Sequence, residues 1–194
     1  MPIPLGVLAV AGAGGGGVAG NGYEWLETQV LTSAAASVTF SNLNSSYGTT
    51  YEHLQVRLTG RSSRNDNGDT VRIRLNSDTG SNYAMHALKG SGSAVTSEGF
   101  GSQTNIQFYR ISANTDANNV FGAMIIDILD PFSTNKTKTI RGLGGYAGIA
   151  DGDEIALSSG LWNNTAALTT LELAGTNGNF QIGSRFSLYG MRSS

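Results

Sequence analysis

The chain has 194 residues, a formal net charge of −2 and no cysteine, and only 13% of its residues are charged. Its few basic residues are scattered along the chain, which argues against nucleic acid as a partner, because binding to nucleic acid relies on many cationic contacts to phosphates. The lack of cysteine excludes disulfides and thiolate chemistry. The length suits a single domain with a full hydrophobic core.

The N-terminal segment has an unusual composition. Eight of its first 22 residues are glycine, and no charged residue precedes Glu24. The apolar run over residues 5–11 is far shorter than the roughly 20 residues that a transmembrane helix needs, so no membrane partner is expected. A signal peptide is the alternative, since residues 9–11 (Ala-Val-Ala) are typical of a cleavage site. The segment nevertheless lacks a positively charged start and carries two prolines there.

We therefore predict an extended, glycine-rich N-terminal arm over residues 1–22, followed by a β-sandwich domain over residues 23–194. Glycine-rich termini are ordered only when something holds them, so the arm is expected to anchor the protein to a neighbouring molecule. The glycines at 14–17 would act as a flexible hinge. The residues predicted to bind the partner are Pro2, Ile3, Pro4, Leu5, Val7, Leu8 and Val10.

The stretch over residues 70–83 shows the unit that the rest of the chain repeats, a strand followed by a polar turn. Three aliphatic residues alternate with Arg72 and Arg74, so apolar and charged side chains fall on opposite faces of one strand. A turn rich in Asn, Asp, Ser and Gly follows, in which Gly80 can adopt a positive φ. A second strand, residues 84–88, is expected to return antiparallel.

Eleven short strands are predicted at regular spacing, separated by turn signals. They cover residues 24–32, 37–40, 53–58, 70–75, 84–88, 105–112, 121–129, 138–143, 154–157, 168–174 and 185–191. The continuous apolar run at 121–129 indicates a central strand covered on both faces. Residues 90–105 show no strong strand pattern, and the glycines at 144–145 are expected to interrupt the sheet. The pattern predicts an all-β fold, an antiparallel β-sandwich of the jelly-roll type.

Few residues are candidates for metal binding or catalysis. Residues 65–69 (Asn-Asp-Asn-Gly-Asp) resemble part of a calcium loop, but the closing bidentate Glu is missing and the same residue types form plain hairpin loops. Residues 151–154 are interpreted in the same way. The two histidines, His53 and His86, are accompanied by no nucleophile-elbow motif around any serine. We therefore predict no catalytic residues, no metal, no cofactor and no enzymatic activity.

The aromatic residues allow two interpretations. Trp25, Trp162 and several tyrosines could form a surface that stacks on sugar rings, or they could pack in the core or at an interface. They follow the strand alternation instead of gathering in one loop, which favours packing.

Several short motifs occur in a fixed order along residues 23–192. They are Ala-Ser-Val-Thr-Phe at 36–40 after an aromatic-led strand, Tyr-Glu-His-Leu-Gln-Val-Arg at 51–57, Arg-Ile-Arg-Leu-Asn-Ser-Asp-Thr-Gly-Ser-Asn-Tyr at 72–83, Ile-Asp-Ile-Leu-Asp at 126–130, Thr-Asn-Lys at 134–136, Ser-Gly-Leu-Trp at 159–162 and Phe-Ser-Leu-Tyr-Gly at 186–190. In these motifs the chain resembles a family of virion structural proteins of tailed bacteriophages, notably those of cyanobacteria and other aquatic hosts. The 51–57 stretch matches the family's Tyr-x-His-Leu-Gln-hydrophobic-Arg strand, and 72–83 resembles its most distinctive segment.

The resemblance implies a structural part in the virion without catalysis. Such domains are placed on capsids as decoration or cement proteins, and on tails as fibre-associated or receptor-binding components. The capsid surface is favoured because the sequence lacks the coiled-coil heptads or repeats of a fibre shaft. The expected partners are the major capsid protein or other virion proteins, together with copies of the same chain in a homo-oligomer, for which a trimer is expected. The alternative is a tail module that recognises host glycans.

Overall fold

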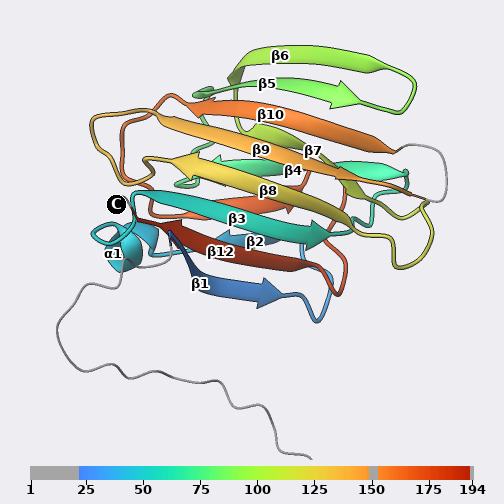
Figure 1. Cartoon of the computed structure of the whole chain (residues 1–194), viewed down its shortest axis with the longest axis horizontal. Coiled ribbons are helices and arrows are strands. Elements are labelled where there is room, and N and C mark those ends of the chain that lie inside the picture. The colour runs from blue at the N-terminus through green and yellow to red at the C-terminus, as the bar shows by residue number, and fades with distance from the viewer. Residues whose placement is uncertain (1–21, 149–152, 193–194) are drawn as a thin grey trace, which may run out of the picture.

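The computed structural model of the chain describes residues 22–148 and 153–192. Within them lie twelve strands, which form two antiparallel sheets, and one short helix, α1 (Leu43–Tyr47) (Figure 1). The larger sheet has the order β1 (Tyr23–Val30), β12 (Arg185–Met191), β3 (His53–Gly60), β8 (Gly122–Leu129), β9 (Lys138–Tyr146), β10 (Glu154–Trp162), β5 (Tyr83–Gly90) and β6 (Val95–Gln103). The smaller sheet has the order β2 (Ser37–Phe40), β11 (Leu171–Gly175), β4 (Gly68–Leu75) and β7 (Ile106–Ser112).

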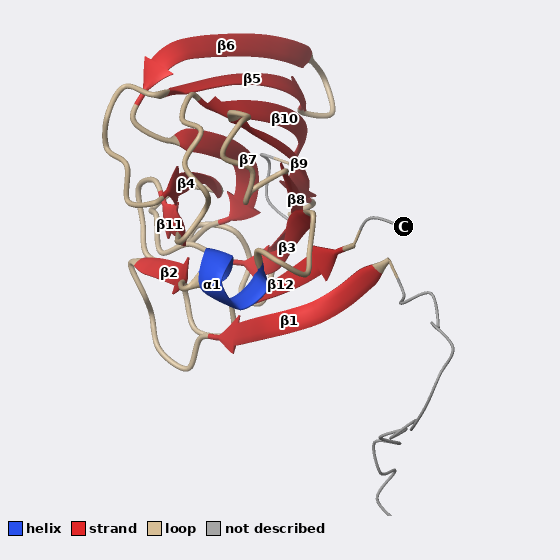
Figure 2. Cartoon of the chain, turned by 90° about the vertical axis from the view of Figure 1, so that its left-hand side faces the viewer, coloured by secondary structure: helices blue, strands red, loops and turns tan. Residues whose placement is uncertain are grey.

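The larger sheet curves around the smaller one, and the core lies between them (Figure 2). On β3, for example, Leu54, Val56 and Leu58 point into the core and are buried, while Arg57 between them is exposed. This alternation is expected of a sheet with one covered face. The prediction of an all-β antiparallel sandwich is therefore confirmed. Its jelly-roll form stays a prediction, and residues 1–21 of the expected arm lie outside the described residues.

Strand β7 packs closely against the inner face of the larger sheet because that face carries glycine at the points of contact. Gly160 on β10 faces Ile106 of β7, and a Cβ atom at Gly160 would lie only 2.7 Å from the Ile106 side chain. Gly142 on β9 faces the ring of Phe108 in the same way. Glycine in a strand often marks such a close approach, so these residues set the distance between the two sheets.

Several expectations about individual strands are corrected by the structure. Strand β9 runs through Gly144 and Gly145 without interruption, because the glycines there permit close packing and do not form a turn. Strand β6, within residues 90–105, was not predicted because it is an edge strand whose side chains are mostly exposed. Strand β8 is central, as predicted, but within the described residues only its inner face is covered, since Ile125 is 43% exposed.

The polar turn after β4 leads from one sheet to the other. Strand β5 pairs with β10 and β6 in the larger sheet, so the predicted antiparallel return of residues 84–88 onto β4 is wrong. Positive φ angles occur at Asn76 and Ser77, where Gly80 had been expected to supply one. The Asn76 side-chain oxygen accepts a hydrogen bond from the backbone N–H of Thr169 (2.7 Å), which helps to hold this left-handed conformation.

Buried aromatic residues fix the same turn. Tyr83 and Trp162 are almost fully buried, and their rings stack with centroids 6.4 Å apart. The Trp162 indole N–H donates a hydrogen bond to the Asp78 carboxylate (2.7 Å), and the Asn82 side-chain amide donates another (2.9 Å). These hydrogen bonds lower the pKa of Asp78, because they stabilise its charged form. Burial raises the pKa of Tyr83 to about 12. The polar turn is thus part of the boundary of the core.

Candidate functional site

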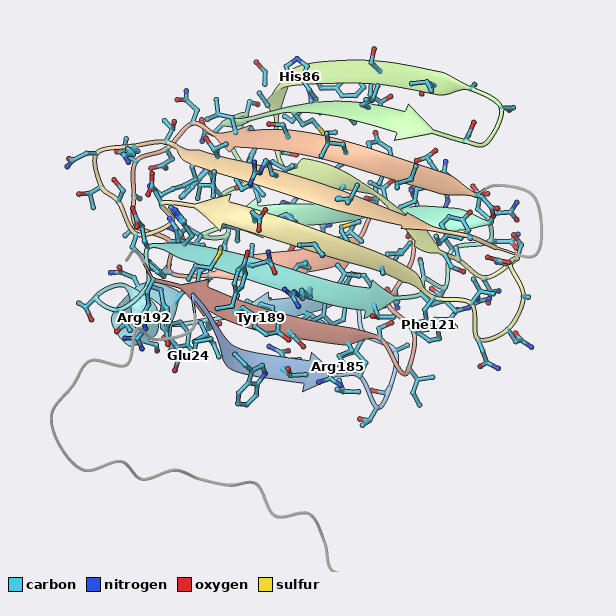
Figure 3. All side chains as sticks on the ribbon, viewed as in Figure 1. Glu24, His86, Phe121, Arg185, Tyr189 and Arg192 are labelled. Atoms are coloured by element: carbon cyan, nitrogen blue, oxygen red, sulfur yellow. The ribbon has the colours of Figure 1, made fainter. Side chains whose placement is uncertain are left out.

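The outer face of the larger sheet is the side that the smaller sheet does not cover. Because all its strands are antiparallel, paired residues point to the same face, and the register places outward side chains in rows across the sheet. One row is mostly polar and aromatic: Trp25, Tyr189, Gln55, Asp127, Arg141, Ser159 and His86. In Figure 3 this face is seen from outside, with Tyr189 and His86 labelled on β12 and β5, toward its two ends.

The neighbouring rows form an apolar surface, which we call the aliphatic strip. Its members are Ile125, Leu143, Leu157, Leu88 and Ile155, from strands β8, β9, β10 and β5. The first four are directly paired in a line across these strands, and Ile155 lies two positions from Leu157 on β10. Adjacent strands are about 4.8 Å apart, so the side chains touch one another and make one continuous band. Each is between 43% and 61% exposed.

The orientation of β10 is unusual for a strand in a sandwich. Its large aliphatic side chains, Ile155, Leu157 and Leu161, point outward, whereas Ala156, Ser158 and Gly160 point toward the core, and Trp162 is its one large inward side chain. An amphipathic strand ordinarily turns its bulkier apolar residues inward. On β10 the inward positions must be small because β7 packs against them, and the outward positions carry the apolar surface.

A hollow of about 550 Å³ lies at one end of the aliphatic strip. Gly90 and Gly145 contribute no side chains, and this leaves a depression between Ile125, Leu143 and Ile155. The charged residues at its rim are Asp153 and Glu154. The lining is otherwise apolar, so the hollow can accept an aliphatic side chain but offers little to hold a polar ligand.

The other end of the outer face, on β1, β12 and β3, is aromatic and polar. The Arg57 guanidinium lies over the rings of Tyr189 (4.9 Å to the centroid) and Tyr23 (5.8 Å). Its Nε donates a hydrogen bond to the Gln55 side-chain oxygen (2.8 Å), and the Gln55 amide nitrogen donates to Asp127 (2.7 Å). These contacts tie side chains of four strands, β1, β12, β3 and β8, into one fixed network.

The two tryptophans have different surroundings. Trp162 packs in the core, as the packing interpretation predicted, so it cannot stack on a sugar. Trp25 is 61% exposed on the outer face, and its indole N–H donates a hydrogen bond to the Thr28 hydroxyl (2.8 Å). Of the two, only Trp25 is placed to contact a ligand.

One group of possible metal ligands occurs among the described residues. The side chains of Glu52, His53 and Asp130 have ligand atoms within 4.8 Å of one another. The His53 Nδ1 accepts the backbone N–H of Asp130 (3.1 Å), and the Asp130 carboxylate pairs with Lys136 (2.7 Å). These contacts occupy His53 Nδ1 and one oxygen of Asp130. His86 lies on β5, four strands away from His53 in the sheet order.

The loop that resembles part of a calcium site joins the two sheets and is not a hairpin, since β3 and β4 belong to different sheets. Asp69 is fully buried, and its carboxylate accepts hydrogen bonds from the Ser62 hydroxyl (2.7 Å) and the Thr70 backbone N–H (2.9 Å). The carboxylate therefore has a structural part in this connection. Residues 151–152 of the second acidic turn lie outside the described residues.

The arm residues predicted to bind a partner, from Pro2 to Val10, also lie outside the described residues. Among the residues that the structure describes, no helix is long and apolar enough to cross a membrane. Comparisons with protein-family models, with curated proteins and with solved structures found no match to this chain. The outer face and the sequence motifs are therefore the features of this chain that bear on its function.

Sequence reasoning did not identify the aliphatic strip. The signal was present in residues 155–161, where large aliphatic residues alternate with Ala, Ser and Gly. That alternation is typical of an ordinary strand whose large residues point toward the core. Only the position of β7 shows that the small residues face the core.

Proposed function

We propose that the protein is a non-enzymatic structural protein of a bacteriophage virion, a capsid decoration or cement protein that stabilises the head. The observation that carries this proposal is the aliphatic strip, because a continuous exposed apolar surface of this kind marks a contact site for another protein. The low charge of the chain suits close packing in an assembly. The resemblance of its sequence motifs to those of phage virion proteins is in line with this proposal.

The strip would give each copy a modest binding energy. Fully burying one exposed Leu or Ile side chain stabilises a complex by about 1.5–3 kcal/mol, and these side chains are already about half covered. Five of them would therefore contribute on the order of 5 kcal/mol per copy, before the entropy cost of association. A contact of this strength is weak alone and becomes stable when many copies and a second attachment point act together.

The proposed partners are the major capsid protein or other virion proteins, and copies of the same chain in a homo-oligomer, proposed as a trimer. The sandwich body would sit on the capsid surface with the strip against a neighbour, and the arm would supply the second attachment point. Deleting residues 1–20 should then leave a folded domain that no longer joins the particle. Normal incorporation of this truncated protein would contradict the anchoring part of the proposal.

The experiment that tests the proposal is immunogold labelling of intact virions, with antibody raised against residues 23–194. Gold spread over the heads is the expected result. Gold confined to the tail would overturn the capsid assignment, and no gold on any particle would overturn the virion assignment itself.

A second candidate is a tail module that recognises host glycans, and the exposed aromatic end of the outer face favours it. Trp25 and Tyr23 are at least half exposed, and Gln55 and Arg57, which lies over the Tyr23 ring, are held in fixed positions. Aromatic faces stack on sugar rings and planar polar groups bind hydroxyls. On a glycan array, the Trp25→Ala variant should lose binding while Phe100→Ala, an exposed aromatic residue on β6, keeps it. If the protein bound no glycan on the array, this candidate function would be contradicted.

A further inference from the structure

The shape of the aliphatic strip limits what can cover it. The polar row with Asp127, Arg141 and Ser159 runs along one side, so the apolar band is only about two side chains wide. The sheet is also convex on this side, because it curves around the smaller sheet (Figure 2). Two convex bodies touch over a small area, whereas a stable protein interface buries about 800 Å² on each partner. A single narrow, apolar and uncharged chain segment fits the strip better than a second sandwich body.

The chain carries such a segment shortly before β1 in the sequence. Residues 3–10 contain Ile3, Leu5, Val7, Leu8 and Val10, and they have no charge. They are connected through the glycine-rich residues 11–22 to Tyr23, the first residue of edge strand β1. We propose that residues 3–10 bind to the aliphatic strip of their own chain, before the protein is assembled.

The connection is long enough for this. Strand β1 is three strands from β8 and six from β5 in the sheet order. At about 4.8 Å per strand, the strip therefore begins roughly 15 Å from β1 and ends roughly 30 Å from it. The 12 residues between Val10 and Tyr23 can span about 40 Å when extended. The glycines at 14–17 allow the chain to turn back over the face.

The hollow at the end of the strip fits the same occupant. Its volume of about 550 Å³ is ample for one or two aliphatic side chains of the arm. Aliphatic side chains such as those of Leu5 and Leu8 would leave water there and contact Ile125, Leu143 and Ile155. The carboxylates of Asp153 and Glu154 at the rim meet no charge on the arm, so they do not oppose binding.

Binding of the arm to the strip would also add a regulatory step, the release of the arm during assembly, and this step alone rests on the proposed function. If the strip contacts a neighbour in the virion, the arm must leave the strip during assembly, which frees both surfaces together. Before assembly, the bound arm would keep the apolar face of the free protein out of water. Binding of the arm itself is a property of the free chain and can be tested without any virion.

Because the chain has no cysteine, pairs of introduced cysteines give a clean test in the purified full-length protein. Leu8→Cys is combined with Ser159→Cys, an exposed position beside the strip, and treated with a short bismaleimide. The control pairs Leu8→Cys with Thr39→Cys on β2, in the smaller sheet. Thr39 lies near Gln29 on β1, whose side chain donates a hydrogen bond to its carbonyl, about 20 Å along the strand from Tyr23. Ser159 on β10 is about 24 Å from β1, so the two positions are at a similar reach of the arm and Thr39 controls for reach alone.

An intrachain cross-link at Ser159→Cys is expected at least about ten times faster than at Thr39→Cys, because the bound arm has a high local concentration at the strip. Adding Leu143→Asp and Leu157→Asp should reduce the rate to that of the control, with the fold verified by circular dichroism. Equal rates for the two pairs would overturn the inference. Cross-linked dimers in place of monomers would also overturn it, because they would make the occupant a second copy. None of these outcomes depends on where gold labels the virion, so failure here is distinct from failure of the proposed function.

Discussion

The inner and outer faces of the larger sheet are built from the same strands and meet opposite requirements. On the inner face of β9 and β10, Gly142 and Gly160 leave room for β7, and the large apolar side chains come mainly from other strands. On the outer face, one residue away along the chain, the sandwich leaves Leu143 and Leu161 exposed. The size of the side chains on each face therefore depends on what packs against that face. The hydrophobicity of a strand's residues alone does not identify which face lies toward the core.

The comparison also separates two kinds of apolar residue. Inward residues such as Ile126 have no exposed surface, so any loss of volume leaves a cavity. Outward residues such as Ile125 are only partly covered by the sandwich, so truncation should cost the sandwich little stability. If the outer face serves binding, its residues should matter for assembly and not for folding, and the following variants test this division.

The largest effect is expected from the adjacent pair Ile126 and Ile125 on β8. Ile126→Ala should lower the free energy of unfolding by about 2–5 kcal/mol, because it removes fully buried methyl groups and leaves a cavity. Ile125→Ala should lower it by less than about 1 kcal/mol. Urea denaturation followed by circular dichroism measures both. Equal losses would mean that Ile125 is buried in the free protein by something other than the sandwich, the arm being the first candidate.

A smaller effect is expected from two glycines in different surroundings. Gly142→Ala should destabilise the protein by about 1–3 kcal/mol, because its new methyl group would press on the Phe108 ring at the contact with β7. Gly101→Ala on β6, where nothing lies within 4 Å of the added carbon, should be neutral or slightly stabilising. Thermal unfolding of both variants in the same buffer compares their stabilities directly. A neutral Gly142→Ala would show that the two sheets can move apart, and the account of the inward glycines would be wrong.

The next effect concerns pH. Hydrogen bonds from Trp162 and Asn82 lower the pKa of Asp78 below its ordinary value of 3.8, so the folded state favours the carboxylate. The associated stability is fully present above about pH 4 and is lost as the pH falls through the folded pKa. Asp78→Asn should lower the free energy of unfolding by about 1 kcal/mol at pH 7, allowing for partial exposure, and the difference should shrink below pH 3.8. Urea titrations from pH 7 to pH 2.5 measure it, and a difference that stays constant with pH would contradict this explanation.

The sequence was sufficient to predict those strands in which the alternation of apolar and polar residues matches the covered and exposed faces of the sheet. On β3, Leu54 and Val56 alternate with polar residues, and both the strand and its inward face could be predicted. On β10 the pattern was equally regular, but the inward face depends on β7, which lies far away in the chain. A single strand cannot report how closely a distant strand approaches it, so the aliphatic strip could not be found from local periodicity.

The same limit applies to edge strands and connections. Strand β6 has little apolar content because it extends beyond the smaller sheet and covers little core, so it has no strong pattern to detect. The turn after β4 has the residue types of a hairpin, and those residue types do not determine whether the chain returns to the same sheet. Pairing between distant segments decides both features.

The smallest effect on stability, and the most informative for function, is expected from Leu157 in the middle of the strip. Leu157→Thr keeps a residue that suits a strand and removes most of the exposed apolar surface, so the free energy of unfolding should change by less than about 0.5 kcal/mol. Co-sedimentation of the variant with phage heads should nevertheless fall several-fold if the strip is the contact surface. Ser159→Thr, at the next outward position of β10, is the matched control and should bind normally. Unchanged binding of both variants would show that the strip is not part of the proposed interface. A large loss of stability in Leu157→Thr would show that the strip stabilises the fold, and the proposed difference in function between the two faces would then be wrong.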